Sequence, residues 1–191
     1  ICKYISSSFY ESRLKSHPIT KERSVSLELK EIKNEGIFYL PVDHQDCTQK
    51  SDEEAKIIKD YCSKILGKNY TEDKQKKKMT IDDIMMVAPF NMQVNNLKKI
   101  LNKKEARIGT IDKFQGQESK VVFISMTSSD PENLPRHKEF FFSRNRLNVA
   151  ISRAQCVAVI LFNPKLLLAD CQKINEIRLV NNFCKLLKYE I

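Results

Sequence analysis

The chain has 191 residues, with 33 Lys and Arg against 24 Asp and Glu, and a formal net charge of +9. A hydrophobic content of 41% with 30% charged residues is typical of a globular chain and excludes wholesale disorder. No pair among its four glycines has the spacing of a P-loop, so this sequence contains no triphosphate cradle of its own.

Helical and strand patterns alternate through the first half of the chain. Ser51, followed three residues later by Glu54, is a capping signature that predicts the start of an amphipathic helix. The predicted elements are a lead-in helix within residues 1–20 (helical pattern over 1–15, closed at Pro18), a polar stretch without assignment over 19–36, a strand over 37–42, a helix over 51–66 and a charged loop over 67–80.

The second half contains short, almost continuously apolar runs between helices. The predicted elements are strands over 84–88, 107–111, 121–126 and 156–162, helices over 94–101 and 145–154, a loop over 128–141, and a final helical region interrupted near Asp170. Apolar strands that alternate with helices are typical of a parallel sheet covered on both faces. We therefore predict one α/β domain over residues 1–191, with a mainly parallel sheet between two helical layers.

The cysteines and histidines show no ligand spacing. Six scattered cysteines without a C-x-x-C pair favour reduced thiols in a cytoplasmic protein over disulfides or a zinc site. The start of the chain is no signal peptide, and no run of 18 apolar residues exists. We expect no metal site and no membrane association.

Three polar segments each follow a predicted strand or lead into one. Ligands of open α/β sheets gather at the carboxyl ends of strands, so we expect the segments to meet there. In the first, Pro89 stops a strand, Asn91 can cap the next helix, and Gln93 presents an amide near that helix start, which is an anion site. An ordinary strand–helix turn explains the same residues.

The second segment runs from Gly109 to Glu118. Two glycines seven residues apart indicate a close backbone approach or special backbone angles. Thr110, Gln115 and the backbone amide of Gly116 could donate to phosphates, and Glu118 could accept from a ribose hydroxyl. The alternative is a tight surface loop.

The third segment, residues 144–154, is a predicted helix. Arg146 and Arg153 are seven residues apart and share one face of it, opposite an apolar stripe. Arginine suits bidentate phosphate recognition better than lysine. A basic amphipathic helix with solvated arginines is the alternative.

These segments resemble known helicase motifs. The sequences T-I-D-x-F-Q-G-Q-E and R-L-N-V-A-I-S-R-A, in this order, resemble motifs V and VI of superfamily 1 helicases. A-P-F-N-x-Q and the opening S-S-S-F-Y-E-S-R-L are similar to segments of the second RecA-like domain of these proteins.

Further stretches, such as S-D-E-E-A, resemble bacterial fusions of a RecB-like nuclease to a superfamily 1 helicase. The resemblance spans nearly the whole chain and is weakest over 16–36 and 67–80. It implies a three-layer RecA-like fold and an excised C-terminal domain.

The resemblance also implies site residues. ATP with Mg²⁺ would lie between two RecA-like domains, held mainly by the first one, which supplies the P-loop lysine and the metal-binding carboxylates. Arg153 matches the arginine finger, Gly116 and Glu118 match nucleotide-facing residues, and Gln115 lies between nucleotide and nucleic acid. Arg146 either supports the same cleft or forms an ion pair within the motif.

The remaining motif residues match the nucleic-acid side. Thr110 matches a hydroxyl that contacts the backbone, and the A-P-F-N-x-Q match adds Pro89, Phe90, Asn91 and Gln93. The implied partners are single-stranded DNA, with RNA as the alternative, the first RecA-like domain and a RecB-like nuclease domain.

Two other functions fit parts of the sequence. A non-catalytic module that binds single-stranded nucleic acid would explain the positive charge and the missing P-loop. A nuclease could use Glu118-Ser119-Lys120 as its E-x-K motif with Asp112 upstream, but the neighbouring Gly116 puts Glu118 at a loop edge, where such a site does not form.

Overall fold

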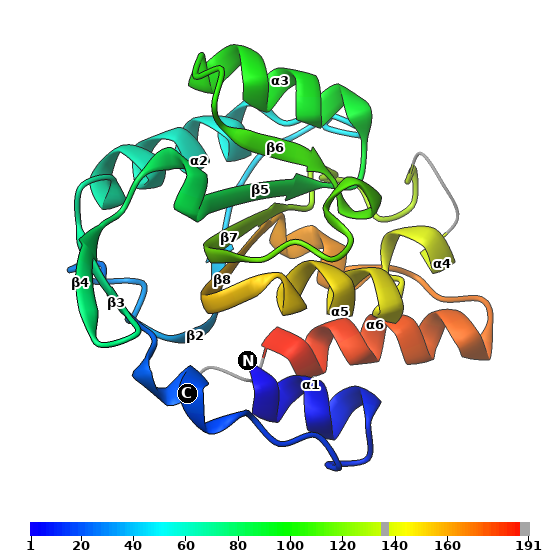
Figure 1. Ribbon diagram of the computed structural model, residues 1–191. Coiled ribbons are helices and arrows are strands. Elements are labelled where there is room, and N and C mark those ends of the chain that lie inside the picture. Colours follow the sequence, from blue (N-terminus) through cyan, green and yellow to red (C-terminus); the bar gives the residue numbers. More distant parts are fainter. Residues whose placement is uncertain (135–137, 188–191) are drawn as a thin grey trace.

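A computed structural model describes residues 1–134 and 138–187. Its main sheet has five parallel strands in the order β2-β8-β7-β5-β6 (Figure 1). They are β2 (Gly36–Pro41), β5 (Ile84–Ala88), β6 (Arg107–Thr110), β7 (Ser119–Ser125) and β8 (Ala154–Phe162). Every residue of β5 and β7 is buried, which explains their continuous apolar runs.

Helices cover both faces of this sheet. On one face lie α2 (Asp52–Ile65) and α3 (Asn91–Leu101); on the other lie α1 (Cys2–Phe9), α4 (Lys138–Phe141), α5 (Arg144–Ser152) and α6 (Ile174–Leu187). Successive β7 residues alternate between the two cores: Phe123 packs under α2 and α3, and Val122 under α5. The predicted α/β class is confirmed, and the three layers are those of a RecA-like fold.

Most predicted elements are confirmed, with shifted ends. The Ser51 hydroxyl accepts a hydrogen bond from the Glu54 amide at 3.1 Å and begins α2. The lead-in helix is shorter than predicted, because Glu11 and Ser12 take positive φ values and turn the chain after Phe9. The described residues also form four short 3-10 helices: η1 (Pro18–Glu22), η2 (Ile81–Asp83), η3 (Ile111–Phe114) and η4 (Pro164–Leu168).

The loop predicted over residues 67–80 is instead a β-hairpin. Strands β3 (Asn69–Glu72) and β4 (Gln75–Lys78) are joined by Asp73 and Lys74, whose φ values are 50° and 63°. Together with β1 (Ser24–Ser26) they form a separate antiparallel sheet in the order β1-β3-β4. The loop prediction is wrong because Tyr70 is the only large apolar side chain in these two strands, so no alternating pattern marks them.

One lysine joins this small sheet to the main one. Lys120, in β7, donates to the Glu72 carboxylate and to Gln155 Oε1 at 2.7 Å, and its ammonium lies 5.2 Å from the centre of the Tyr70 ring. The hydrogen bond from Lys120 lowers the pKa of Glu72. The hairpin is therefore fixed to the main sheet close to its turn.

A buried polar network joins α2, α3 and β7 at the carboxyl ends of the strands. Gln93 has no exposed surface; its side chain accepts from the Ser51 amide at 2.9 Å and donates to the Ser51 carbonyl at 2.9 Å and to Ser125 Oγ at 3.0 Å. The carboxylate of Glu54 accepts from the Ser125 hydroxyl and from the Thr127 amide. Such fully paired amides and carboxylates fix the relative positions of the elements that carry them.

Burial also sets the state of two thiols. All six cysteines are free; Cys62 and Cys156 are buried and the other four are half-buried. Burial raises the pKa of Cys62 to about 12 and also raises the pKa of Cys156. Within the described residues, no helix combines the length and apolar character that a membrane crossing requires.

Replacing Gln93 by Ala should lower the free energy of unfolding by about 1–3 kcal/mol, because it leaves the buried amide of Ser51 without its hydrogen-bond acceptor. Urea unfolding followed by circular dichroism measures this loss. Asn95→Ala, an exposed position on the same helix, is the matched control. Equal midpoints for the two variants would contradict the role given to the network.

Candidate functional site

The motif residues divide between two opposite edges of the main sheet. All five strands run parallel, so the segment after Thr110 starts at the carboxyl edge and must return to the amino edge, where Ser119 begins β7. Helix α5 makes the same return from Arg144 to Arg153, just before β8. The expectation that the three polar segments meet at the carboxyl ends is therefore wrong for Glu118 and Arg153, which lie at the amino edge.

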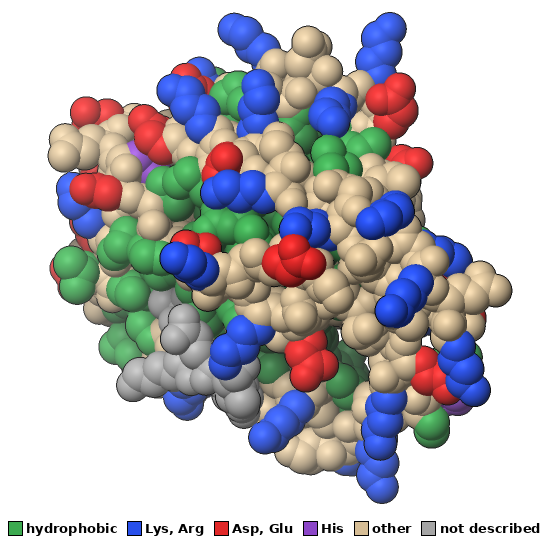
Figure 2. All heavy atoms as spheres, turned by 90° about the vertical axis from the view of Figure 1, so that its left-hand side faces the viewer, with side chains coloured by type: hydrophobic (Ala, Val, Ile, Leu, Met, Phe, Trp, Pro, Cys, Tyr) green, Lys and Arg blue, Asp and Glu red, His purple; other side chains and the backbone are tan. Residues whose placement is uncertain are grey.

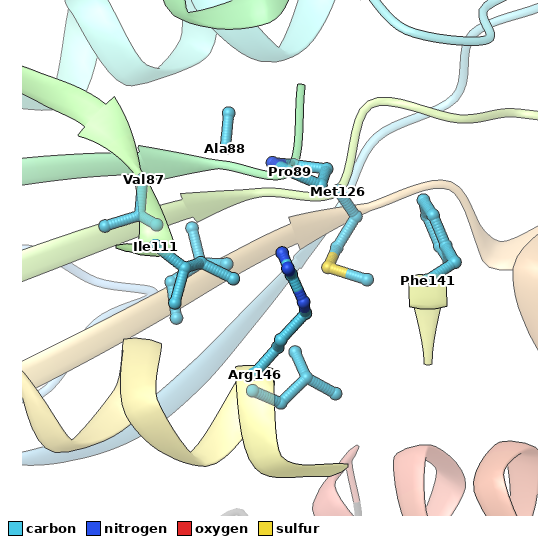
Figure 3. Close-up of a pocket in the computed structure, with 9 residues that line it drawn as sticks. Val87, Ala88, Pro89, Ile111, Met126, Phe141 and Arg146 are labelled. Carbon is cyan, nitrogen blue, oxygen red and sulfur yellow. The ribbon is translucent and has the colours of Figure 1, made fainter. Parts of the chain in front are cut away.

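A small apolar pocket lies at the carboxyl edge (Figure 3). Eight apolar residues line it together with Arg146: Val87, Ala88, Pro89, Ile111, Ile124, Met126, Phe141 and Leu147. Arg146 points from α5 toward the ends of β5 and β6, between Pro89 and Ile111 (Figure 3). Thr110, the last residue of β6, is half-buried at the same edge.

Arg146 lies apart from Arg153. Its guanidinium is 3.5 Å from the Asp112 carboxylate, in an ion pair within the motif segments. The two arginines are separated by seven residues of helix, or about 10 Å at 1.5 Å per residue. Of the two roles that the sequence left open for Arg146, the structure shows the ion pair, and a role in a nucleotide cleft stays a prediction.

In the first segment, two predicted contact residues are buried and the predicted helix cap lies at another residue. Gln93 is fully committed to the buried network and cannot reach a ligand, and Phe90 is buried, with its ring 6.4 Å from that of Phe141. Phe90, not Asn91, is the N-cap of α3, and it offers no side-chain hydrogen bond. Asn91 is exposed and Pro89 lines the pocket, so these two remain at the surface of the carboxyl edge.

The glycines of the second segment have the two uses that the sequence predicted. A Cβ on Gly109 would lie 2.7 Å from Lys113 Cδ and 3.0 Å from Phe114 Cε2, so a close approach requires glycine there. Gly116 has a φ of +79° and turns the chain toward the amino edge. Gln115 and Gly116 are both exposed.

Arg153 ends α5 at the amino edge. Its guanidinium donates to the carbonyl of Val149 at 3.0 Å, to the carbonyl of Gln117 at 3.2 Å and to the hydroxyl of Ser152 at 3.1 Å. These contacts fold the side chain against its own helix and the end of the second segment. The side chain is half-buried, so part of the guanidinium faces solvent.

Arg107, the first residue of β6, is a second cation at the amino edge, and it was not predicted from the sequence. It donates to the carbonyls of Asp82 and Glu118, both at 3.0 Å, and to Gln117 Oε1 at 3.1 Å. Arg107 thus binds the side chain of Gln117, and Arg153 binds its backbone carbonyl. The only signal in the sequence is an arginine at the start of an apolar strand, which has no specific meaning by itself.

The Glu118 side chain connects the loop to its surroundings. Its carboxylate accepts from Gln155 Nε2 at 3.0 Å and lies 4.0 Å from the guanidinium of Arg23. Asp112 is at the opposite edge with Arg146, and Lys120 is buried against Glu72. Because these three side chains do not converge, the E-x-K nuclease arrangement is not formed.

The donor chemistry of the amino edge fits phosphate oxygens. Three guanidinium groups, those of Arg23, Arg107 and Arg153, contact the Gln117–Glu118 stretch, and guanidinium is a strong phosphate donor. Among the described residues, no three His, Cys, Asp or Glu side chains converge as metal ligands. The guanidinium groups at the amino edge can therefore donate hydrogen bonds to the phosphate oxygens of a triphosphate placed there.

Comparison with known proteins places the chain in a family. A family profile described as "AAA domain" matches residues 1–165. The chain is 28% identical over 173 residues to the DNA polymerase alpha-associated DNA helicase A of Schizosaccharomyces pombe, which is 80% of this chain and 24% of that protein.

Two other similar proteins also match this chain over only a small part of their own length. The DNA-binding protein SMUBP-2 of Mesocricetus auratus is 28% identical over 172 residues, 81% of this chain and 16% of its own length. The RNA helicase Mov10l1 of Mus musculus is 34% identical over 94 residues, 46% of this chain and 8% of its own length. The chain thus spans at most about a quarter of these relatives, whereas the family profile covers most of the chain. It belongs to the AAA domain family.

Proposed function

We propose that the chain is the second RecA-like motor domain of an ATP-dependent superfamily 1 helicase. In this proposal Arg153 is the arginine finger, and Gln115, Gly116 and Glu118 face a nucleotide that the first RecA-like domain holds. The names of the similar proteins, two of them helicases and one a DNA-binding protein, support the nucleic-acid partner. A RecB-like nuclease domain elsewhere in the full-length protein remains a prediction from the sequence resemblance.

The observation that carries the proposal is the division of the motif residues between two edges. A motor domain needs one surface for a nucleotide and another for a nucleic-acid strand, joined by elements that move together. Here the second segment connects Thr110 at the carboxyl edge to Glu118 at the amino edge. Helix α5 likewise connects Arg146 at the carboxyl edge to Arg153 at the amino edge. In this proposal, a change at one end of a segment reaches the other end through that continuous stretch of chain.

ATP with Mg²⁺ would supply the free energy of the cycle. An arginine beside the transferring phosphoryl group stabilises the charge that grows in the transition state. Arg153 would donate to that charge, and Glu118 would accept from a ribose hydroxyl. At the other edge, Thr110, Pro89 and Asn91 would contact backbone atoms of single-stranded DNA or RNA, with little dependence on sequence.

Arg153→Ala in the full-length protein should lower the nucleic-acid-stimulated ATPase rate on the order of 10³-fold, because the transition-state charge loses its guanidinium partner. A coupled assay of phosphate release at saturating ATP measures it. Arg178→Ala removes an exposed arginine from α6 and is the control. A rate for Arg153→Ala equal to that of the control would contradict the finger assignment.

The 191-residue chain alone should hydrolyse no ATP and should bind a single-stranded oligonucleotide weakly. Binding should fall steeply between about 50 mM and about 200 mM salt, because phosphate contacts release counterions. Phosphate release and fluorescence anisotropy of a labelled oligonucleotide test the two expectations. Robust turnover by the isolated chain would overturn the proposal that another domain supplies the rest of the site.

A further inference from the structure

We propose that the outer face of the small β1-β3-β4 sheet is a second contact surface for the phosphate backbone of single-stranded nucleic acid. It is distinct from the carboxyl edge, where the proposed function places Thr110, Pro89 and Asn91. The inference takes the class of partner from the proposed function. The location of the surface is argued from the hairpin and its pairing with β1, independently of the proposed function.

The two faces of the hairpin differ in composition. In β3, Tyr70 and Glu72 point to the body of the protein, where Tyr70 is buried and Glu72 meets Lys120. Because side chains alternate along a strand, their neighbours point outward. The strand register then gives the six outer-face residues, Ser24, Ser26, Asn69, Thr71, Lys76 and Lys78.

The six side chains of this outer face are polar or positively charged. Every one of its six side chains can donate a hydrogen bond, and none is acidic or apolar. A protein partner would need an apolar or aromatic anchor, which the outer face lacks. Hydroxyl, amide and lysine groups are instead the side chains that contact phosphate and sugar oxygens.

The charge of the hairpin is concentrated and partly uncompensated. Residues 67–80 carry five lysines against Glu72 and Asp73, a net charge of +3 out of the +9 of the whole chain. Lys77 pairs with Glu72 at 3.4 Å on the inner face, and Lys74 lies 3.9 Å from Glu22 with 82% of its side chain exposed. Within the described part of the chain, no carboxylate lies within ion-pair distance of Lys76 or Lys78, although Lys78, after Lys68, helps to lower the pKa of Glu28.

The spacing of these two lysines suits an extended strand of nucleic acid. Residues two apart on one face of a β-strand are separated by about 6.6 Å, comparable to neighbouring phosphates of an extended single strand. Figure 2 views the side of the molecule on which the hairpin lies, and basic side chains project over that face with acidic ones between them. Lys76 and Lys78 of β4 would bind neighbouring phosphates on this face.

The turn end of the hairpin is also connected to the proposed nucleotide side. Glu72 contacts Lys120, Lys120 contacts Gln155, and Gln155 donates to the Glu118 carboxylate. A strand bound on the hairpin would therefore lie a few side-chain contacts from Glu118. Both surfaces belong to the amino-edge side of the fold.

The double variant Lys76→Ala/Lys78→Ala tests the inference in the 191-residue chain. Fluorescence anisotropy with a labelled oligodeoxythymidine should show affinity falling on the order of tenfold near 0.1 M salt, and the slope of log K against log[salt] becoming shallower by about 1.4. The slope change follows from two lost phosphate contacts. Both lysines are exposed, so urea unfolding should match the unaltered chain.

Lys98→Ala/Lys99→Ala is the matched control, because it removes two exposed lysines from the end of α3. An equal loss for both double variants would mean that net charge alone governs binding and would overturn the inference. So would an unchanged affinity, or no binding by the unaltered chain. Loss of ATPase in Arg153→Ala tests the proposed function separately, since it requires no change at the hairpin.

Discussion

Parallel pairing of all five strands is the constraint on which the arrangement of the site depends. Each strand must be followed by a connection that returns along the full length of the sheet before the next strand can begin. The connection between β6 and β7 makes this return as a loop with one 3-10 turn, and α5 makes it as a helix. A motif ten residues long therefore has its two ends on opposite edges of the molecule. The parallel sheet separates Thr110 from Glu118 even though they are close in sequence.

The amino edge is organised around a short stretch of backbone. Gln117 receives hydrogen bonds on its carbonyl from Arg153 and on its side chain from Arg107, which also binds the carbonyl of Glu118. The acceptors in these hydrogen bonds are neutral carbonyl oxygens. The bonds therefore position the guanidinium groups of Arg107 and Arg153 without cancelling their positive charge. A phosphate oxygen would be a stronger acceptor for Arg153 than the carbonyl of Gln117. The observed contacts hold the arginine near the edge without neutralising it.

Much of the fold could be predicted from the sequence, because burial leaves a local pattern. The runs in β5, β7 and β8 and the Ser51 cap of α2 were each visible as patterns of apolar or capping residues. The hairpin was not, since it is anchored by one tyrosine and by a lysine 50 residues further along the chain. An interaction between residues distant in sequence leaves no periodicity that a reading of one strand can detect.

The same distinction explains which site residues were predicted. Gly109 and Gly116 were recognised because backbone requirements depend on the residue itself. Gln93 looked like a surface amide at a helix start, yet its partners come from Ser51 and Ser125, which only the fold brings near it. Arg107 was missed for the same reason, as its three acceptors come from two other segments.

The two edges are also fastened by different kinds of interaction. At the carboxyl edge, Gln93, Ser51 and Ser125 are joined by buried hydrogen bonds between neutral groups, which dissolved ions do not screen. At the amino edge, the side chains of Arg23 and Glu118 face water, where an ionic atmosphere of about 8 Å thickness at physiological strength weakens their attraction. Rising ionic strength therefore weakens the Arg23–Glu118 pair at the amino edge, while the buried hydrogen bonds of Gln93 at the carboxyl edge keep their strength.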